Sequence, residues 1–364
     1  MDSLFDLISP KIKSNDWKWS FSDYPKEKNG LKVFSCFACG GGSTMGYKLA
    51  GCDVLGCVEI DPRMNKIYTN NHHPKYNFCM DIRDFNNLND SDIPEELFHL
   101  DILDGSPPCT TFSMAGDRED SWGKKKKFRE GQQEQTLDDL SFVFIETVKK
   151  LKPKVVIMEN VEGLILGEAF SYVQKIYKEF TDAGYFVHHW LLKGENMGVP
   201  QTRHRVFFVA INASLQIDPS WLDMSFNYAP ITYGEIREGP AFPLQPTQVF
   251  YDIAKQAIDS DKTIADTKVR LGQKNSGFNT VYIRDDSVVP TIRVKADLID
   301  VKRMQYSSIE TIRNSQTFPT DYDFINYTRS NVSYICGMSV PPIMMKRVIT
   351  RLIEQGVFNY AKSM

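Results

Sequence analysis

One cysteine of this chain stands in a setting suited to covalent chemistry. Cys109 lies in the stretch Asp104-Gly-Ser-Pro-Pro-Cys-Thr-Thr-Phe-Ser113, directly after two prolines that fix the backbone of the loop. The loop follows an apolar run, 98–103, which predicts a buried strand. Ligands of open α/β sheets bind at the carboxyl ends of strands, so Cys109 is a candidate nucleophile. A buried structural thiol is the alternative, because free cysteine is among the most buried residue types.

A carboxylate and two arginines follow or precede later strands. Glu159 comes directly after a predicted strand at 155–158, where a carboxylate could act on a substrate nitrogen. Arg203 and Arg205 precede a predicted strand at 206–211, and both side chains share one face if that strand begins early. Guanidinium groups suit a phosphate or a developing oxyanion. The alternatives are a helix-capping acid for Glu159 and a solvated strand edge for the arginines.

A glycine-rich turn, Phe37-Ala-Cys-Gly-Gly-Gly42, predicts a small-molecule site. Glycine lets the backbone approach a ligand closely, and the N-terminus of the following helix favours polar or anionic groups. Glu59, at the tip of the next predicted strand, can accept both hydroxyls of a ribose. Asp81 is a candidate for a third contact, to an adenine amino group. The turn lacks G-x-G-x-x-G, which argues against a nicotinamide dinucleotide; a plain tight turn and a surface aspartate are the alternatives.

The elements that would position these residues alternate between strands and helices. Strands are predicted at 31–37, 54–60, 98–103, 155–158, 186–192 and 206–211, and helices at 43–50, 137–151, 169–183, 308–314 and 343–354. This alternation predicts an α/β fold with a doubly wound, largely parallel sheet. The rhythm is lost after Ile211, where short apolar runs and prolines predict a second, smaller and irregular domain. We expect an extension at 1–30, an α/β domain at 31–211 that carries the candidate site residues, a second domain at 212–287, and a return to the first domain at 288–364.

Composition adds limits rather than a function. The chain has 364 residues, 42% hydrophobic and 24% charged, with a net charge of −3 that neither advertises nor excludes a polyanion. Seven irregularly spaced cysteines favour a reduced cytoplasmic protein, and no apolar run is long enough to span a membrane. Cys36 and Cys39 form a C-x-x-C without a second pair at zinc spacing, so we expect no metal site. The run Lys124–Lys127 could contact phosphates or be a solvated surface, whereas His72-His73 and His188-His189 are expected to be structural or exposed.

Taken in order, these blocks closely resemble those of the DNA cytosine-5 methyltransferases of bacteria and phages. The resemblance covers roughly Leu31 to Glu354, and the order and spacing of the blocks make it specific. The matching blocks are Phe37–Gly42, Glu59, Met80-Asp-Ile82, Pro108–Ser113, Glu159-Asn-Val161, Gln201-Thr-Arg-His-Arg205, Ser308–Arg313 with Gln316–Pro319, and Gly337–Pro342.

The resemblance implies a covalent mechanism on a cytosine that has been flipped out of the duplex. The thiolate of Cys109 would add to carbon 6 of the base and make carbon 5 nucleophilic. Glu159 would hold the exocyclic amine and ring nitrogen 3. Arg203 and Arg205 would orient the base and stabilise the adduct.

The resemblance also implies S-adenosylmethionine as the methyl donor in a Rossmann-like domain. Glu59 would hold its ribose and Asp81 its adenine. The other cofactor-lining positions it implies are Phe37, Ala38, Cys39, Gly40, Gly42, Ile60, Ile82, Pro108, Leu137 and Ser339. Three positions depart from the family: Cys39 replaces a glycine, Met338 an asparagine, and Gln135-Thr136 an Arg-Gly pair. We expect a tighter cofactor loop and weaker cofactor affinity as a result.

Double-stranded DNA is the expected partner, recognised by the segment 212–287. We further expect a cytoplasmic monomer that does not bind membranes and that shares its DNA site with a cognate restriction endonuclease. A tRNA methyltransferase of the same fold is the nearest alternative, because that branch has a similar Ser106–Cys109 loop, but its Cys-Phe-Thr signature is absent here. An inactive DNA-binding homologue is a further alternative, against which the intact Cys109, Glu159, Arg203 and Arg205 argue.

Overall fold

The computed structural model describes residues 11–108, 140–167, 170–295 and 297–359, and the backbone alone of the short strands β5 (Lys125–Lys126) and β6 (Gln135–Thr136). The chain divides into two compact units. The larger unit comprises Tyr24–Leu192, His204–Ser225 and Met345–Met364, and the smaller unit comprises Met1–Asp23, Lys193–Arg203 and Phe226–Met344. In this division, 193–203 and 288–344 belong to the same unit as most of the segment 212–287.

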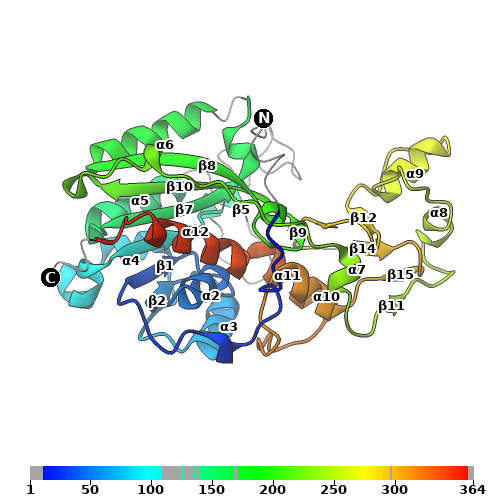
Figure 1. Cartoon of the computed structure of the whole chain (residues 1–364), viewed down its shortest axis with the longest axis horizontal. Helices are drawn as coiled ribbons and strands as arrows, with labels where there is room; N and C mark the ends of the chain where they lie inside the picture. The colour runs from blue at the N-terminus through cyan, green and yellow to red at the C-terminus, as the bar shows by residue number, and fades with distance from the viewer. Residues whose placement is uncertain are drawn as a thin grey trace. The chain divides into compact units, whose positions relative to one another are not determined.

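A seven-stranded sheet lies at the centre of the larger unit, in the order β3-β2-β1-β4-β7-β10-β8 (Figure 1). Its strands are β1 (Lys32–Cys36), β2 (Asp53–Val58), β3 (Tyr76–Phe78), β4 (Ile102–Gly105), β7 (Val155–Val161), β8 (Tyr185–Lys193) and β10 (His204–Asn212). The pairs from β3 to β7 are all parallel, whereas β10 runs antiparallel to β7. This is the expected doubly wound, Rossmann-like fold. The strand order reverses between β1 and β4, and in such sheets ligands bind at that crevice.

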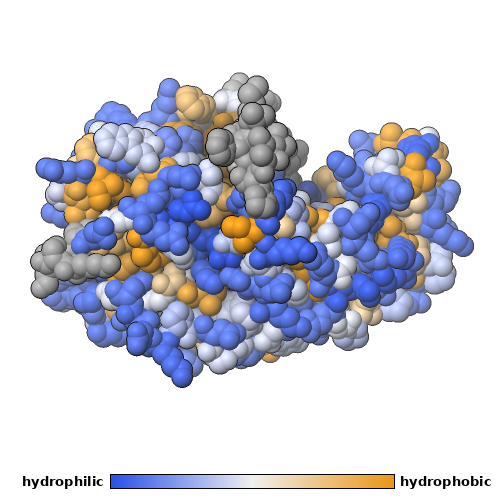
Figure 2. Space-filling view, viewed as in Figure 1, coloured by the Kyte–Doolittle hydropathy of each residue, from blue (hydrophilic) through white to orange (hydrophobic). Residues whose placement is uncertain are grey.

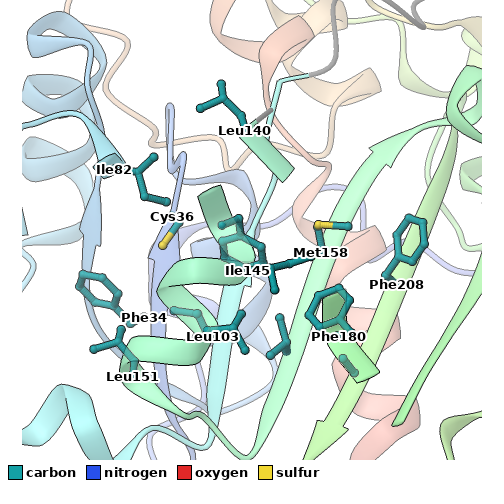
Figure 3. Close-up of a cluster of buried hydrophobic side chains, with 14 of the residues drawn as sticks. Phe34, Cys36, Ile82, Leu103, Leu140, Ile145, Leu151, Met158, Phe180 and Phe208 are labelled. Carbon is teal, nitrogen blue, oxygen red and sulfur yellow. The ribbon is translucent and has the colours of Figure 1, made fainter. Parts of the chain in front are cut away.

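Helices α4 (Ile82–Asn87), α5 (Leu140–Leu151) and α6 (Phe170–Asp182) cover one face of the sheet with a continuous apolar core. Figure 3 shows this core, in which side chains of α5 and α6 meet alternate residues of the strands. Its labelled members are Phe34, Cys36, Ile82, Leu103, Leu140, Ile145, Leu151, Met158, Phe180 and Phe208. Fully burying one large apolar side chain contributes about 1.5–3 kcal/mol, so this face supplies much of the stability of the sheet.

The intervening strand residues point to the opposite face, because side chains alternate along a strand. Ser35 of β1 is paired with Asp104 of β4, and Asp104 in turn with Ile157 of β7. Helix α2 (Gly42–Leu49) lies against this face through Tyr47, whose hydroxyl donates to Asp104. Two further helices are α3 (Pro62–His72) and α12 (Pro342–Glu354).

Two predicted strand boundaries were wrong. The apolar run 98–103 is split between a 3-10 turn (Glu95–His99) and β4, because Leu97 and Leu100 turn into the core before the strand begins. Strand β7 continues past Met158 to Val161, because β10 pairs with it over that length. The later boundary places Glu159 inside a strand rather than after it.

The smaller unit combines irregular segments with a small sheet of its own. Its four strands run in the order β11-β15-β14-β12, over a small core that includes Leu244, Ile264, Tyr282 and Ile299. The strands are β11 (Phe242–Pro243), β12 (Thr280–Ile283), β14 (Asp297–Asp300) and β15 (Gln305–Tyr306); a separate pair joins β9 (Gln201–Thr202) and β13 (Val289–Pro290). The helices are α7 (Tyr233–Ile236), α8 (Tyr251–Ala254), α9 (Ile264–Arg270), α10 (Ile309–Ser315) and α11 (Arg329–Met338).

The described residues contain neither a membrane-spanning helix nor a metal-binding cluster. No helix there is long and apolar enough to cross a bilayer. No group of three or more histidine, cysteine, aspartate or glutamate side chains there is placed to hold a metal ion. The six cysteines that the structure describes, Cys36 and Cys39 included, form no disulfide with one another.

Candidate active site

A buried ion pair joins two neighbouring strands of the larger unit. Arg205 of β10 lies opposite Val161 of β7, and Glu159 is two residues away on the same face. The Nε of Arg205 is 2.9 Å from Oε1 of Glu159, and both side chains are largely withdrawn from water. Burial lowers the pKa of Arg205 from its usual value, an effect that the Glu159 carboxylate opposes. A fixed carboxylate beside a fixed guanidinium can bind a polar heterocycle and stabilise charge that develops on it.

The start of the Pro-Pro loop lies beside this pair. Strands β4 and β7 are neighbours, with Gly105 opposite Met158, so the loop leaves the sheet next to Glu159. The Nδ2 of Asn160 donates to the carbonyl of Pro107 at 3.3 Å and fixes the loop to β7. The loop therefore lies beside β7 at Pro107. Cys109 itself lies outside the described residues.

The glycine-rich turn leaves β1 at the same edge of the sheet. Phe37 and Cys39 have positive φ angles of 58° and 47°, and Gly41 has one of 81°. The amide of Phe37 donates to the carbonyl of Val58 at 3.0 Å, and that of Gly41 donates to Ala38 at 2.8 Å. The backbone of the turn is thus tightly coiled over the end of β2 before α2 begins.

The side chain of Glu59 holds this turn by a hydrogen bond. Its Oε2 accepts a hydrogen bond from the amide of Cys39 at 2.8 Å, and its Oε1 accepts one from the amide of Asp61 at the same distance. The residue is buried, with 7% of its surface exposed. Carboxylate oxygens have two acceptor sites each, so an oriented carboxylate of this kind can also accept hydroxyl groups. The chemistry and position of Glu59 therefore fit a ribose.

The turn is also supported by His72, which the sequence predicted to be structural or exposed. The Nε2 of His72 lies 3.2 Å from the carbonyl oxygen of Gly40, and burial lowers the pKa of His72 to about 3, which keeps the ring neutral. A Cβ atom at Gly41 would lie 2.0 Å from Nε2 of His72. Glycine is needed at position 41 for this close approach as well as for its positive φ.

Asp104 is the buried polar residue of the site that sequence analysis missed. It lies within β4, five positions before Cys109, and is only 2% exposed. Ser35 donates to Oδ2 at 3.0 Å and Tyr47 donates to Oδ1 at 3.1 Å. Burial, together with the nearby Glu159, raises the pKa of Asp104 to about 7, although the hydrogen bonds from Ser35 and Tyr47 oppose this rise. The available signal was an aspartate within an otherwise apolar strand, which points to a special environment.

Other predicted cofactor contacts have local structural roles. Asp81 caps α4, because its Oδ1 accepts from the amide of Arg83 at 2.8 Å. The side chain of Ile82 belongs to the apolar core, as Figure 3 shows. Ile60 and Pro108 are half-buried at the ends of β2 and β4. Leu137 lies outside the described residues, and the contacts of all these residues with a cofactor stay predictions.

Arg203 and Ser339 fall in the smaller unit. Strand β10 begins at His204, so Arg203 does not share a strand face with Arg205 as expected. The guanidinium of Arg203 donates to the carbonyls of Ile292 at 3.4 Å and Gly337 at 3.2 Å. Ser339 donates to Ile335 at 2.8 Å at the end of α11. These bonds hold the smaller unit together, and a catalytic or cofactor-binding role for either residue remains untested.

Comparison with known proteins agrees with this geometry. The family model of the C-5 cytosine-specific DNA methylases matches residues 31–306. The Type II methyltransferase M1.HphI of Haemophilus parahaemolyticus is 25% identical over 356 residues, covering 93% of this chain and 91% of its own length. M.FnuDI of Fusobacterium nucleatum is 32% identical over 187 residues, so the chain spans about half the length of this relative. A prophage-encoded Escherichia coli protein described as a DNA modification methyltransferase has the same fold, with a TM-score of 0.61 at 18% identity over 89% of this chain and 99% of its own.

Proposed function

The chain belongs to the C-5 cytosine-specific DNA methylase family, and from this premise we propose that it methylates carbon 5 of cytosine in double-stranded DNA at a specific sequence. The observation that carries the proposal is the buried Glu159–Arg205 pair beside the Pro-Pro loop. DNA is favoured over tRNA because the matching family model and the Type II relatives are those of DNA methyltransferases.

In the proposed reaction, Cys109 is the nucleophile. Its thiolate forms a bond to carbon 6 of a flipped cytosine, and the electron pair of the 5,6 double bond makes carbon 5 nucleophilic. Glu159 binds the exocyclic amine and nitrogen 3, while Arg205 keeps this carboxylate oriented and stabilises charge on the ring. After carbon 5 has been methylated, loss of its proton restores the double bond and expels the thiolate.

S-adenosylmethionine would supply the methyl group. We infer that the turn at Phe37–Gly42 and the carboxylate of Glu59 hold it. The turn follows β1, at the switch point between β1 and β4, and Glu59 follows the neighbouring strand β2 and binds the turn. Asp81 is proposed to bind the adenine in addition to capping α4, as the family resemblance implies; its Oδ2 lies 3.5 Å from the guanidinium of Arg83.

Target recognition is proposed for the segment 212–287. Within it, Val249, Val269 and Phe278 are exposed, and Figure 2 shows hydrophobic groups among a largely hydrophilic surface. Apolar side chains of this kind can contact thymine methyl groups. Arg270 is bound to Asp261 at 2.8 Å, so its loss would disturb folding rather than specificity.

Lys274 is an exposed polar candidate for base contacts in the same segment, whereas Lys268 donates to Ser276 at 3.0 Å. Replacing Lys274 by alanine should reduce the preference for target over non-target DNA. Replacing Lys124–Lys127 by alanine should weaken binding to both and flatten the salt dependence, because fewer counterions are released. The two roles would be reversed if replacing Lys124–Lys127 altered the methylated sequence while replacing Lys274 did not.

The central test uses labelled S-adenosylmethionine with duplex DNA or tRNA. We expect label in DNA only, and none with a Cys109→Ser variant that remains folded. Duplexes containing 5-fluorocytosine should trap a covalent complex with the wild type, because fluorine blocks the loss of the carbon 5 substituent. Label in tRNA, or normal turnover by Cys109→Ser, would refute the proposal.

The proposed setting is a cytoplasmic monomer whose methylation protects sites from a cognate restriction endonuclease. Sequencing the methylated bases of a host that expresses the chain would identify the target site. Cleavage of the unmethylated site by an extract of the source cells would support the endonuclease, and sedimentation would measure the oligomeric state.

A further inference from the structure

We propose that Asp104 is a positioning residue for the cofactor turn, because its buried carboxylate ties α2 to β1 and β4 directly behind that turn. This inference rests on the proposed function. Asp104 touches neither of the groups proposed to react, so its effect would be exerted through the backbone of Phe37–Gly42.

The contacts form one connected polar network. Asp104 accepts from Ser35 at the end of β1 and from Tyr47 in α2. The Oγ of Ser35 lies 3.5 Å from Oγ1 of Thr44 in the first turn of α2, and Thr44 is 2.9 Å from the hydroxyl of Tyr68 in α3. The network therefore holds α2 at two points, one near its first turn and one near its last.

The first turn of α2 directly follows the glycines. Gly41 occupies the N-cap position and has no side chain with which to fix the helix start. The orientation of the turn therefore depends on where the body of α2 is held, and the Ser35–Asp104–Tyr47 bonds hold it. A buried carboxylate is an unfavourable way to fill space, so its presence indicates that its hydrogen bonds are needed.

The charge state of Asp104 should decide how strongly it holds α2. The titratable groups that interact with it are Cys36 of β1, Tyr47 of α2, Tyr68 of α3 and Glu159 of β7, and none of these described groups is a cation. An ionised carboxylate accepts charge-assisted bonds from both hydroxyls. A protonated one must also place its own proton, so one of these bonds is weakened or lost.

Because burial raises the pKa of Asp104 to about 7, both states exist near neutral pH. If the turn binds the cofactor only when Asp104 is ionised, the apparent affinity scales with the ionised fraction. That fraction rises from roughly one tenth at pH 6 to roughly nine tenths at pH 8, which predicts about a tenfold gain in affinity.

Calorimetric titration with S-adenosylmethionine at pH 6, 7 and 8 tests this inference. The wild type should bind about tenfold more tightly at pH 8 than at pH 6. Asp104→Asn should lose this difference, and Tyr47→Phe should bind weakly at pH 8 with less pH dependence. Titration of the cofactor's own amino group affects all variants alike, so the comparison between variants removes it.

Asp101→Asn is the matched control. Asp101 is also a buried carboxylate beside β4, but it lies at the opposite end of the strand, where it accepts from the amide of Lys32 at 2.8 Å and from Lys154 at 3.1 Å. This variant should keep the tenfold pH dependence. Binding by the wild type that is equal at pH 6 and 8, or a pH dependence that survives in both Asp104→Asn and Tyr47→Phe, overturns the inference. Failure to bind the cofactor at any pH would instead overturn the proposed function, and this inference with it.

Discussion

Arg205→Met is the substitution that tests the buried ion pair most directly. Methionine keeps much of the apolar stem but leaves the Glu159 carboxylate without its guanidinium. At 2.9 Å the gross attraction between two unit charges is about 6 kcal/mol for an effective dielectric constant of 20. Desolvation consumes part of this, and removing one partner of a buried pair typically costs about 3–5 kcal/mol. We therefore expect the free energy of unfolding to fall by that amount.

Urea unfolding of both single variants and of the double variant Glu159→Gln/Arg205→Met measures the coupling. The double variant should be more stable than the sum of the single losses predicts, because no buried charge is left alone. Lys149→Met is the control, since the Lys149–Glu179 pair is about one third exposed and should contribute less than about 1 kcal/mol. Methyl transfer by Glu159→Gln should fall about 10²–10⁴-fold. If Arg205→Met costs no more than the control, the pair does not position the carboxylate.

Three further predictions concern the cofactor turn. The raised pKa of Asp104 means that, between about pH 4 and pH 7, the native state holds a proton that the unfolded state has lost. The contribution of Asp104 to the free energy of unfolding therefore falls by about 4 kcal/mol as the pH rises through this range. Asp104→Asn should remove this pH dependence from the free energy measured by urea unfolding. Gly41→Ala should destabilise the protein well beyond Gly184→Ala, which has a similar positive φ but open space around it, because only the former meets His72; equal losses would contradict this. Glu59→Gln should weaken cofactor binding by about 1–3 kcal/mol in calorimetry, and unchanged affinity would exclude the ribose contact.

The sheet was predictable because its strands are apolar runs that end in polar residues. Glu59 follows β2, and this placement was confirmed. The family blocks supplied the same assignment independently of periodicity. Strand limits were less accurate near residues 98 and 159, because pairing with neighbouring strands, which local patterns do not contain, decided where those strands begin and end.

The details of the site could not be predicted from spacing alone. Arg203 and Arg205 differ by two positions, and a strand that begins at His204 separates them into different compact units. Asp104 looked like the first residue of the Pro-Pro loop, whereas it lies inside β4 and faces α2. Both outcomes depend on where a strand begins or ends to within one or two residues, which local sequence patterns do not fix.

Side chains from outside the glycine-rich turn hold it in place, so the turn itself can consist largely of small residues. The three glycines at 40–42 have no side chains with which to fix the turn, and each glycine adds conformational freedom that must be lost on folding. In this chain the restraint comes from neighbours: the Glu59 carboxylate holds the amide of Cys39, neutral His72 lies against Gly40 and Gly41, and Asp104 holds α2. All three are buried titratable groups outside the turn. The departure from glycine at Cys39 is compatible with the Glu59 bond, because that bond is made to the backbone amide, whereas the left-handed φ of 47° at Cys39 is a conformation that glycine adopts more readily.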